Sequence, residues 1–198
     1  MRDLIEAWGR RRWPGARVVH ELVVADCRID MAFISADHLA GVEIKSSRDV
    51  MTRLDRQIET FREHLPEVWL AYAPRWLPVL GYDGGNRRLG SGIGHIIVSD
   101  AVDEMIPFSA TSRRGYPRKA VIDEMITSKM LNLLWRDEAF AIAQRTGAVK
   151  VNSRSSLQAM KPALARALTG GQIVREVCRS LRDRDAFWKA DQPMGEAA

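Results

Sequence analysis

The chain has 198 residues and a formal net charge of +5, from 30 Lys and Arg residues against 25 Asp and Glu residues. With 46% hydrophobic and 28% charged residues it is not a disordered chain, and no apolar run approaches the roughly 20 residues needed to span a bilayer. Two cysteines cannot form a disulfide framework, and the first residues show no signal peptide. We therefore expect a cytoplasmic protein with no membrane partner.

The first half of the chain predicts an α/β arrangement. Apolar residues at helical spacing predict helices, and runs rich in Val and Ile predict strands. In chain order, the expected elements are a helix over 3–12, strands over 17–24, 27–34 and 40–46, a helix over 50–65, and strands over 68–73 and 95–99. The order strand, helix, strand around the second helix predicts two parallel strands joined by a crossover. Six glycines within 81–94 predict a loop before the last strand.

The second half of the chain predicts helices and carries the excess of positive charge. Helical segments are expected over 120–146, 155–168 and 172–187. The expected division is a core over 1–108, a basic linker over 109–119, a helical C-terminal region over 120–190 and a tail over 191–198. Residues 1–80 hold twelve basic and twelve acidic residues, so the whole +5 lies after residue 80. A basic helical region of this kind predicts contact with the phosphate backbone of nucleic acid.

Two neighbouring strands carry the residues best suited to chemistry. Because side chains alternate along a strand, Asp30 is expected on the face opposite its apolar neighbours, and Glu43 and Lys45 are expected to share one face of the next strand. A short turn over 35–39 brings Asp30 near Glu43. Two such carboxylates are costly unless a cation lies between them, and hard oxygen ligands suit Mg²⁺ or Mn²⁺. Lys45 can act at the same point, on a water or on a phosphate.

Residues on the flanking elements extend this group. Glu21 on the preceding strand can add a third carboxylate. On the helix that follows, Arg53 and Gln57 are four residues apart and lie on one flank. This flank is expected to meet a phosphate backbone or the scissile phosphate.

The arrangement resembles the PD-(D/E)XK nuclease superfamily, through Glu21, Asp30, the triplet Glu-Ile-Lys at 43–45 and Gln57. The stretch 57–61 is similar to the Gln-x-x-x-Tyr motif of RecB-like members, with Phe61 in place of the tyrosine. A small family of bacterial and prophage proteins, related to MmcB-type DNA repair proteins, is similar to the chain over 20–22, 28–30, 43–46, 53–57, 133–138, 174–177 and 181–182.

The resemblance implies both a fold and an activity. The implied fold is a restriction-endonuclease-like core, with a mixed β-sheet flanked by helices, followed by an all-α C-terminal region. The implied activity is hydrolysis of DNA phosphodiesters with Mg²⁺ or Mn²⁺, in DNA repair, recombination or phage-related DNA processing. Many nucleases of this fold dimerise, so a homodimer is compatible with the resemblance and the oligomeric state stays open.

Each predicted site residue has an expected role. The expected catalytic residues are Glu21, Asp30, Glu43, Lys45 and Gln57. The expected metal ligands are Asp30, Glu43 and the Ile44 main-chain carbonyl, with Glu21 holding a second metal or orienting a water ligand. The expected contacts with nucleic acid are Arg28, Ser46, Arg53, Gln57, Arg113, Arg114, Arg118 and Lys119.

Other interpretations stay open. The nuclease fold can serve as a DNA-binding or complex-forming scaffold without turnover, because fold does not determine function. A regulator that reads DNA through its C-terminal helices is a third class. For the site residues, the alternative is a solvated sheet face on which Asp30 and Glu43 pair with Arg28 and Lys45. Trp135 is expected to be a core residue.

Overall fold

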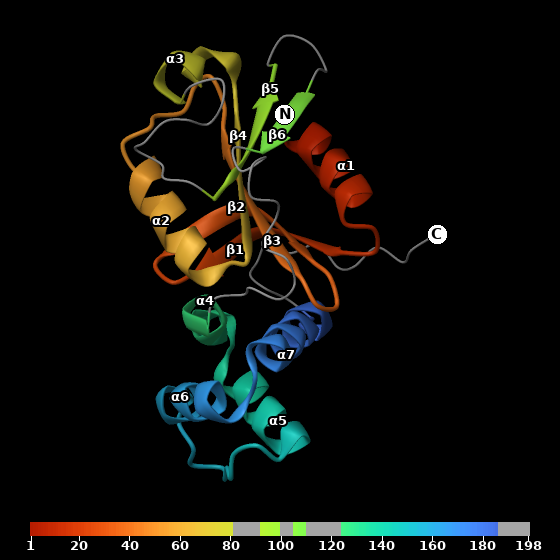
Figure 1. Cartoon of the computed structure of the whole chain (residues 1–198), viewed down its shortest axis with the longest axis vertical. Helices are drawn as coiled ribbons and strands as arrows, with labels where there is room; N and C mark the ends of the chain where they lie inside the picture. Colours follow the sequence, from red (N-terminus) through yellow and green to blue (C-terminus); the bar gives the residue numbers. More distant parts are fainter. Residues whose placement is uncertain (81–91, 100–104, 110–123, 186–198) are drawn as a thin grey trace.

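The computed structural model describes residues 1–80, 92–99, 105–109 and 124–185. Within these ranges, six strands form one mixed sheet in the order β1-β2-β3-β4-β5-β6 (Figure 1). The strands are β1 (Arg17–Val24), β2 (Cys27–Ile34), β3 (Leu39–Lys45), β4 (Glu67–Tyr72), β5 (Gly94–Val98) and β6 (Met105–Ser109). β4 pairs parallel with β3 and β5, and the other neighbours pair antiparallel. The predicted parallel crossover is confirmed, because β3 and β4 are joined through helix α2 (Leu54–His64).

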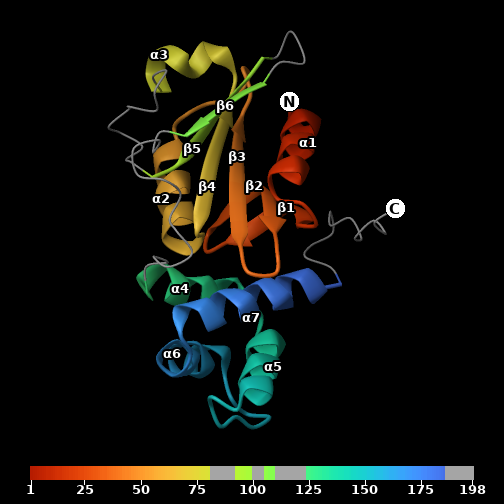
Figure 2. The same cartoon turned by 45° about the vertical axis from the view of Figure 1, so that its right-hand side comes forward.

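Helices cover both faces of the sheet and one end of it (Figure 1, Figure 2). Helix α1 (Arg2–Arg12) lies on one face and α2 on the other. The other helices are α3 (Leu77–Leu80), α4 (Glu124–Met130), α5 (Arg136–Thr146), α6 (Leu157–Ala167) and α7 (Gly170–Asp183), with 3₁₀ turns η1 (Pro74–Trp76) and η2 (Leu131–Leu133). The predicted α/β architecture, a mixed sheet flanked by helices and followed by C-terminal helices, is confirmed. In the part of the chain that is described, no helix is long and apolar enough to cross a membrane.

The face of the sheet under α1 is closed by aromatic side chains. Trp8 packs edge-on against Trp13 and against Trp69 of β4, with ring centroids 5.2 Å and 4.9 Å apart. At Gly9, a Cβ atom would lie 2.0 Å from Cζ of the buried Phe33 ring. Helix α1 can therefore lie directly on β2 only because residue 9 has no side chain.

The opposite face of the sheet shares one apolar core with the C-terminal helices. Leu54, Ile58 and Phe61 are buried at helical spacing along α2. The same cluster of contacting side chains includes Leu70 of β4 and Val177 of α7. The C-terminal helices are therefore held to the sheet by continuous apolar packing.

The prediction of one continuous helix over 120–146 is wrong, because the helix is interrupted between residues 131 and 135. In its described part, α4 ends at Met130, and α5 begins at Arg136 after a 3₁₀ turn. Leu134 and Trp135 between them have extended backbone, with ψ angles of 144° and 165°. The Trp135 N–H donates to Glu138 Oε2 at 2.6 Å, which begins the new helix. Trp135, predicted to be a core residue, is 51% exposed.

Further differences concern elements and boundaries. The helix predicted to begin at residue 50 begins at Leu54. The sequence does not predict α3 or β6, because α3 has only four residues and β6 contains Pro107, which is uncommon inside a strand. Residues 81–91 of the predicted loop, 110–119 of the predicted linker and the tail 191–198 lie outside the described residues.

The predicted alternation of side chains is broken at one level of β1 and β2. The pairing of the two strands continues on both sides of Glu21 and Asp30 but omits these two residues. Glu21 has a left-handed backbone conformation, with φ at 57°. Ile29 and Ala32 both belong to the core on the α2 face, whereas Met31 belongs to the core on the α1 face. The expected division of β2 into one apolar and one polar face is therefore wrong, and Asp30 lies where the side chains change sides.

The β1–β2 hairpin contains a second left-handed residue, Ala25, with φ at 54°. Ala25 lies in the two-residue turn between Val24 and Cys27. Glycine adopts this conformation without the strain that a Cβ atom causes. We expect Ala25→Gly to raise the free energy of unfolding by about 0.5–1 kcal/mol, measured by urea denaturation.

The matched control for this hairpin variant is Ala36→Gly. Ala36 lies in the β2–β3 turn and has no left-handed φ, so the substitution only increases the freedom of the unfolded chain. It should leave stability unchanged or lower it. Equal effects of the two variants would contradict strain at Ala25.

Candidate active site

A pocket of about 500 Å³ opens where β2 and β3 separate, beside the N-terminal end of α2. The pairing of β2 with β3 runs from the turn as far as Met31 and Val42. Eight of the predicted site residues line the pocket: Glu21, Arg28, Asp30, Glu43, Ile44, Lys45, Arg53 and Gln57. The fold thus brings together side chains from three strands and a helix at the point where the strands separate.

Asp30 takes the place of a strand partner for β3. Its Oδ2 accepts a hydrogen bond from the Ile44 N–H at 2.7 Å, so this main-chain donor stays satisfied although β2 has moved away. Burial raises the pKa of Asp30, and this hydrogen bond and the charge of Arg2 oppose the rise. The bond holds the Asp30 carboxylate over β3, next to Glu43.

Glu43 is a buried carboxylate, only 2% exposed. Its Oε1 accepts from Lys45 Nζ at 2.8 Å, and the same Nζ donates to Gln57 Oε1 at 3.1 Å. Its Oε2 is buried and has no hydrogen-bond partner among the described residues. Burial, followed by the negative charge of Asp30, raises the pKa of Glu43 to about 7. Glu43 and Lys45 share the α2-facing side of β3, as their spacing predicts.

The pair Asp30 and Glu43 fits a divalent cation. A cation between them would satisfy the second Glu43 oxygen and remove the repulsion that raises the Glu43 pKa. Carboxylate oxygens are the ligands that Mg²⁺ and Mn²⁺ prefer. Within the described ranges, no group of three or more His, Cys, Asp or Glu side chains is placed to hold a metal. A metal here would therefore take its other ligands from main-chain carbonyls and water.

Arg2, from the first turn of α1, lies against two of these acidic residues. Its Nη2 is 3.1 Å from Asp30 Oδ1 and 3.5 Å from Glu21 Oε1. The Glu21 carboxylate is thus held by Arg2, and its predicted role toward a metal stays a prediction. The Arg2 side chain is 45% exposed, so its ion pair with Asp30 contributes little free energy. The guanidinium can therefore move into solvent if a cation binds Asp30.

Comparison with known proteins assigns the chain to a family. A family model described as bacteriophage P4 protein cII matches residues 4–195. The chain belongs to this family. Among solved structures, SfsA of Pyrococcus furiosus in complex with Ca²⁺ is similar, with a TM-score of 0.35 and 18% identity over 52% of this chain and 58% of SfsA. No curated protein matches the chain.

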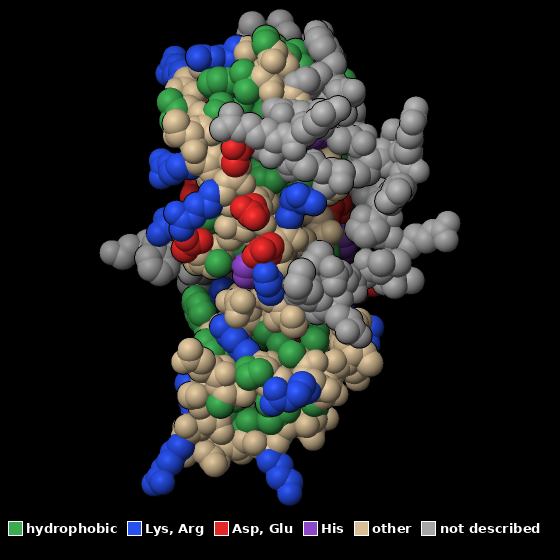
Figure 3. All heavy atoms as spheres, turned by 60° about the vertical axis from the view of Figure 1, so that its left-hand side comes forward, with side chains coloured by type: hydrophobic (Ala, Val, Ile, Leu, Met, Phe, Trp, Pro, Cys, Tyr) green, Lys and Arg blue, Asp and Glu red, His purple; other side chains and the backbone are tan. Residues whose placement is uncertain are grey.

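Basic side chains surround the pocket of this P4 cII family protein. Arg28 and Arg53 are exposed, and Arg56 forms an ion pair with Asp26 at the rim. Arg53 is also the N-cap residue of α2, whose N-terminal end carries a partial positive charge. Figure 3 shows acidic side chains gathered on the α/β part beside Lys and Arg side chains. Such a rim suits an anionic ligand placed above the buried carboxylates.

Other predicted residues of the P4 cII family protein lie elsewhere. The N–H and hydroxyl of Ser46 donate to Asp49 Oδ2 at 2.7 and 2.6 Å, which closes the turn after β3, and Ser46 is outside the pocket lining. Phe61, at the position of the RecB-like tyrosine, is fully buried in the core below α2. The predicted contacts Arg113, Arg114, Arg118 and Lys119 lie outside the described residues.

Sequence reasoning missed four residues at this site: Arg2, Asp26, Asp49 and Arg56. Asp49 carries a local signal, because Ser-x-x-Asp is a spacing at which a carboxylate bonds back to a main-chain N–H. Arg2 carries none, because its partners are 19 and 28 residues away in the chain. In this P4 cII family protein, the contact exists only once α1 has packed on the sheet.

Proposed function

We propose that the chain is a metal-dependent DNA nuclease of the PD-(D/E)XK type. The observation that carries the proposal is the buried pair Asp30 and Glu43, with Lys45 beside it and one Glu43 oxygen left without a partner among the described residues. Burial and the charge of Asp30 outweigh the ion pair of Glu43 with Lys45 and keep the Glu43 pKa raised, which is typical of sites that bind a cation or perform chemistry. The resemblance to MmcB-type DNA repair proteins and the membership of a phage protein family support a role in DNA repair, recombination or phage DNA processing.

In this proposal Asp30 and Glu43 hold Mg²⁺ or Mn²⁺, with the Ile44 main-chain carbonyl as a further ligand. When bound, the ion supplies Lewis-acid polarisation of a phosphate oxygen and makes a water more acidic. Glu21 orients a water at the mouth of the site. Because the pKa of Glu43 is about 7, Glu43 would have to lose its proton to hold the ion, so metal binding would strengthen as the pH rises.

Lys45 and Gln57 position the reacting groups. Lys45 Nζ is fixed by two acceptors, Glu43 and Gln57, at 2.8 and 3.1 Å. An ammonium group held in this way can direct its third N–H at the attacking water or at a phosphate oxygen whose negative charge grows during the reaction. Arg28 and Arg53 at the rim, with the N-terminal end of α2, hold the phosphate backbone of the strand.

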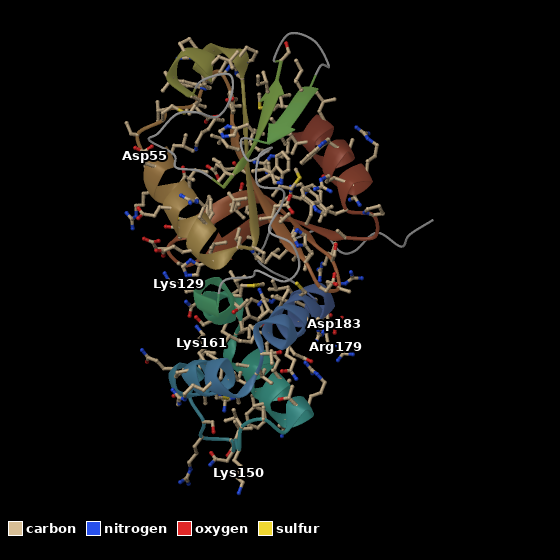
Figure 4. All side chains as sticks on the ribbon, in the orientation of Figure 1. Asp55, Lys129, Lys150, Lys161, Arg179 and Asp183 are labelled. Carbon is tan, nitrogen blue, oxygen red and sulfur yellow. The ribbon has the colours of Figure 1, made fainter. Side chains whose placement is uncertain are left out.

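In this proposal the C-terminal helices add a second DNA-binding surface. Residues 141–180 contain seven basic residues and one acidic residue. Lys150 extends outward from this region (Figure 4). We expect binding through these helices to be independent of sequence and to weaken steeply as salt rises. The two free cysteines, Cys27 and Cys178, fit a reducing cytoplasm, in which we place the reaction.

A second candidate function is a DNA-binding scaffold without turnover. The observation that favours it is Arg2, which already neutralises part of the charge of Asp30. A scaffold has no need of a tight metal site. It would bind DNA equally well with and without Mg²⁺, and after loss of Asp30.

The proposed function is tested by cleavage and by metal binding. The purified chain should cut single-stranded, duplex or branched DNA with Mg²⁺ or Mn²⁺ and not with EDTA. Asp30→Ala and Lys45→Ala should cut at least about 100-fold more slowly, because each removes a group that acts on the reacting atoms. Asp137→Ala is the control, since that acidic side chain is 90% exposed and remote from the pocket. Calorimetry with Mn²⁺ measures the metal site directly.

Two results would overturn the proposal. The first is a parent protein that cuts none of the three DNA forms with either metal. The second is cleavage by Asp30→Ala and Lys45→Ala at the parent rate, which would show that activity lies elsewhere. DNA binding that persists without measurable Mn²⁺ binding would favour the scaffold.

A further inference from the structure

A second pocket, of about 250 Å³, lies between β1 and the start of α5. Its lining includes the exposed side chains of Val23 and Trp135, which are 44% and 51% accessible, and the side chain of Asn132. This volume lies below the roughly 300–1,000 Å³ of pockets for drug-sized ligands, so it suits a single planar ring system. Trp135 and Val23 together give this pocket an exposed apolar surface, against which a planar ring can pack.

Trp135 is held rigidly in this position. The Arg184 guanidinium lies 4.1 Å from the Trp135 ring centroid, and it donates to both Glu138 oxygens at 2.7 and 2.6 Å and to the Leu133 carbonyl at 3.0 Å. The main-chain N–H of Trp135 donates to the same Glu138. The Arg184 side chain is only 6% exposed, so the ring rests on a fixed cation. A ring that is already ordered loses little conformational entropy when a ligand stacks on it.

The second pocket adjoins the candidate active site. Glu21 contributes to the lining of both pockets, and its left-handed backbone lies at the level where Asp30 enters the first one. A molecule with an anionic group over Asp30 and Glu43 therefore has an aromatic surface within reach on the far side of Glu21. A nucleotide strand has this composition, because an anionic phosphate and a planar base alternate along it.

We infer that Trp135, backed by Arg184 and bordered by Val23 and Asn132, stacks an unpaired nucleobase of the DNA strand whose phosphate lies in the active-site pocket. A base inside a duplex is already paired and stacked, so only a single-stranded or locally opened substrate offers its face to Trp135. Asn132 Nδ2 lies 3.5 Å from His64 Nε2, and its side-chain oxygen can accept a hydrogen bond from the edge of the base. The inference rests on the proposed nuclease function and narrows its substrate class to single-stranded or unpaired DNA.

Binding without cleavage tests the stacking contact. In EDTA, the full chain should bind an oligothymidylate more tightly than an abasic phosphodiester chain of the same length. Trp135→Ala should bind oligothymidylate roughly 5- to 100-fold more weakly and lose the difference between the two ligands, since one base–aromatic stack is removed. Trp135→Phe keeps a ring and should retain most of the difference. Oligouridylate tests whether the pocket also takes RNA.

Val79→Ala is the control, because it shortens an exposed apolar side chain on α3, remote from both pockets. It should bind oligothymidylate as the parent does. Thermal unfolding of each variant shows whether Trp135→Ala stays folded. Equal binding of the base-bearing and abasic chains by the parent overturns the inference and leaves the nuclease proposal standing. Failure of the parent to bind either chain also overturns the inference, and the nuclease proposal is then decided by cleavage of duplex and branched DNA with metal.

Discussion

Replacing Glu43 with glutamine is expected to slow metal-dependent cleavage by about 100-fold or more and, without metal, to stabilise the fold. Glutamine keeps the shape and the acceptor for Lys45 but removes a charge from a site that is 2% exposed. Loss of an outer-shell partner of a metal typically costs roughly 10- to 100-fold, so loss of a direct ligand should cost about 100-fold or more in rate. The stability gain follows because burial and the charge of Asp30, which raise the pKa of Glu43, outweigh its ion pair with Lys45.

The size of that gain depends on pH. The pKa of Glu43 rises from 4.5 to about 7 on folding. Between pH 4.5 and pH 7 the folded state therefore holds a proton on Glu43 that the unfolded state has lost. The stabilisation from this proton is complete below pH 4.5 and is lost as the pH rises through 7. A shift of this size corresponds to about 3 kcal/mol at most, and we expect Glu43→Gln to exceed the parent by about 1–3 kcal/mol at pH 8 and by little at pH 4.5.

Urea denaturation at pH 5 and pH 8 in EDTA measures this difference. Added Mn²⁺ should stabilise the parent at pH 8 and leave Glu43→Gln unchanged, because a ligand stabilises only the state that binds it. A variant less stable than the parent at pH 8 would show that the carboxylate is compensated inside the fold. That result would remove the main support for a cation site.

Loss of Arg17 is expected to loosen the C-terminal helices from the sheet. This residue, at the start of β1 and only 7% exposed, donates to the main-chain oxygens of Leu181, Arg182 and Arg184 at the C-terminal end of α7. A cation at this end of a helix satisfies orphan carbonyls and faces the negative end of the helix dipole. Arg17→Met should lower the free energy of unfolding by about 3–5 kcal/mol, since hydrogen bonds to charged groups contribute about 1.5–3 kcal/mol each.

Thermal unfolding should show a fall of roughly 6–20 °C for Arg17→Met, and limited proteolysis should cut first within α7. Arg10→Met is the matched control, because Arg10 is 59% exposed and pairs with Glu6 on its own helix. It should change stability by less than about 0.5 kcal/mol. Equal midpoints for the two variants would mean that apolar packing alone holds α7 in place.

The parts of the fold that follow from local periodicity could be predicted from the sequence. The two hairpin strands β1 and β2 follow from runs rich in Val and Ile, and the face shared by Glu43 and Lys45 follows from regular alternation along β3. The parallel crossover follows from the apolar stripe of α2 between two buried strands. These features depend on residues within one turn or one strand of each other.

The parts that failed depend on distant contacts or on backbone conformations without a sequence signal. A left-handed φ usually calls for Gly or Asn, so nothing at Glu21 indicates where the alternation reverses. Leu131, Leu133 and Leu134 fit a helical period equally well, and no Pro or Gly marks the break before Trp135. The exposure of Trp135 follows from that break.

The reversal at Glu21 and Asp30 bears on protein design. In a regular hairpin, Ile29 would lie on the face opposite Ala32, and a β2 strand that stayed paired with β3 would occupy the Ile44 N–H that now receives Asp30. A graft of the site would therefore need the left-handed residue opposite Asp30 and the open N–H of residue 44 to receive its carboxylate. A design should therefore transfer the irregular strand pairing together with the side chains, and the scaffold should be chosen first for an interruption of this kind between two strands.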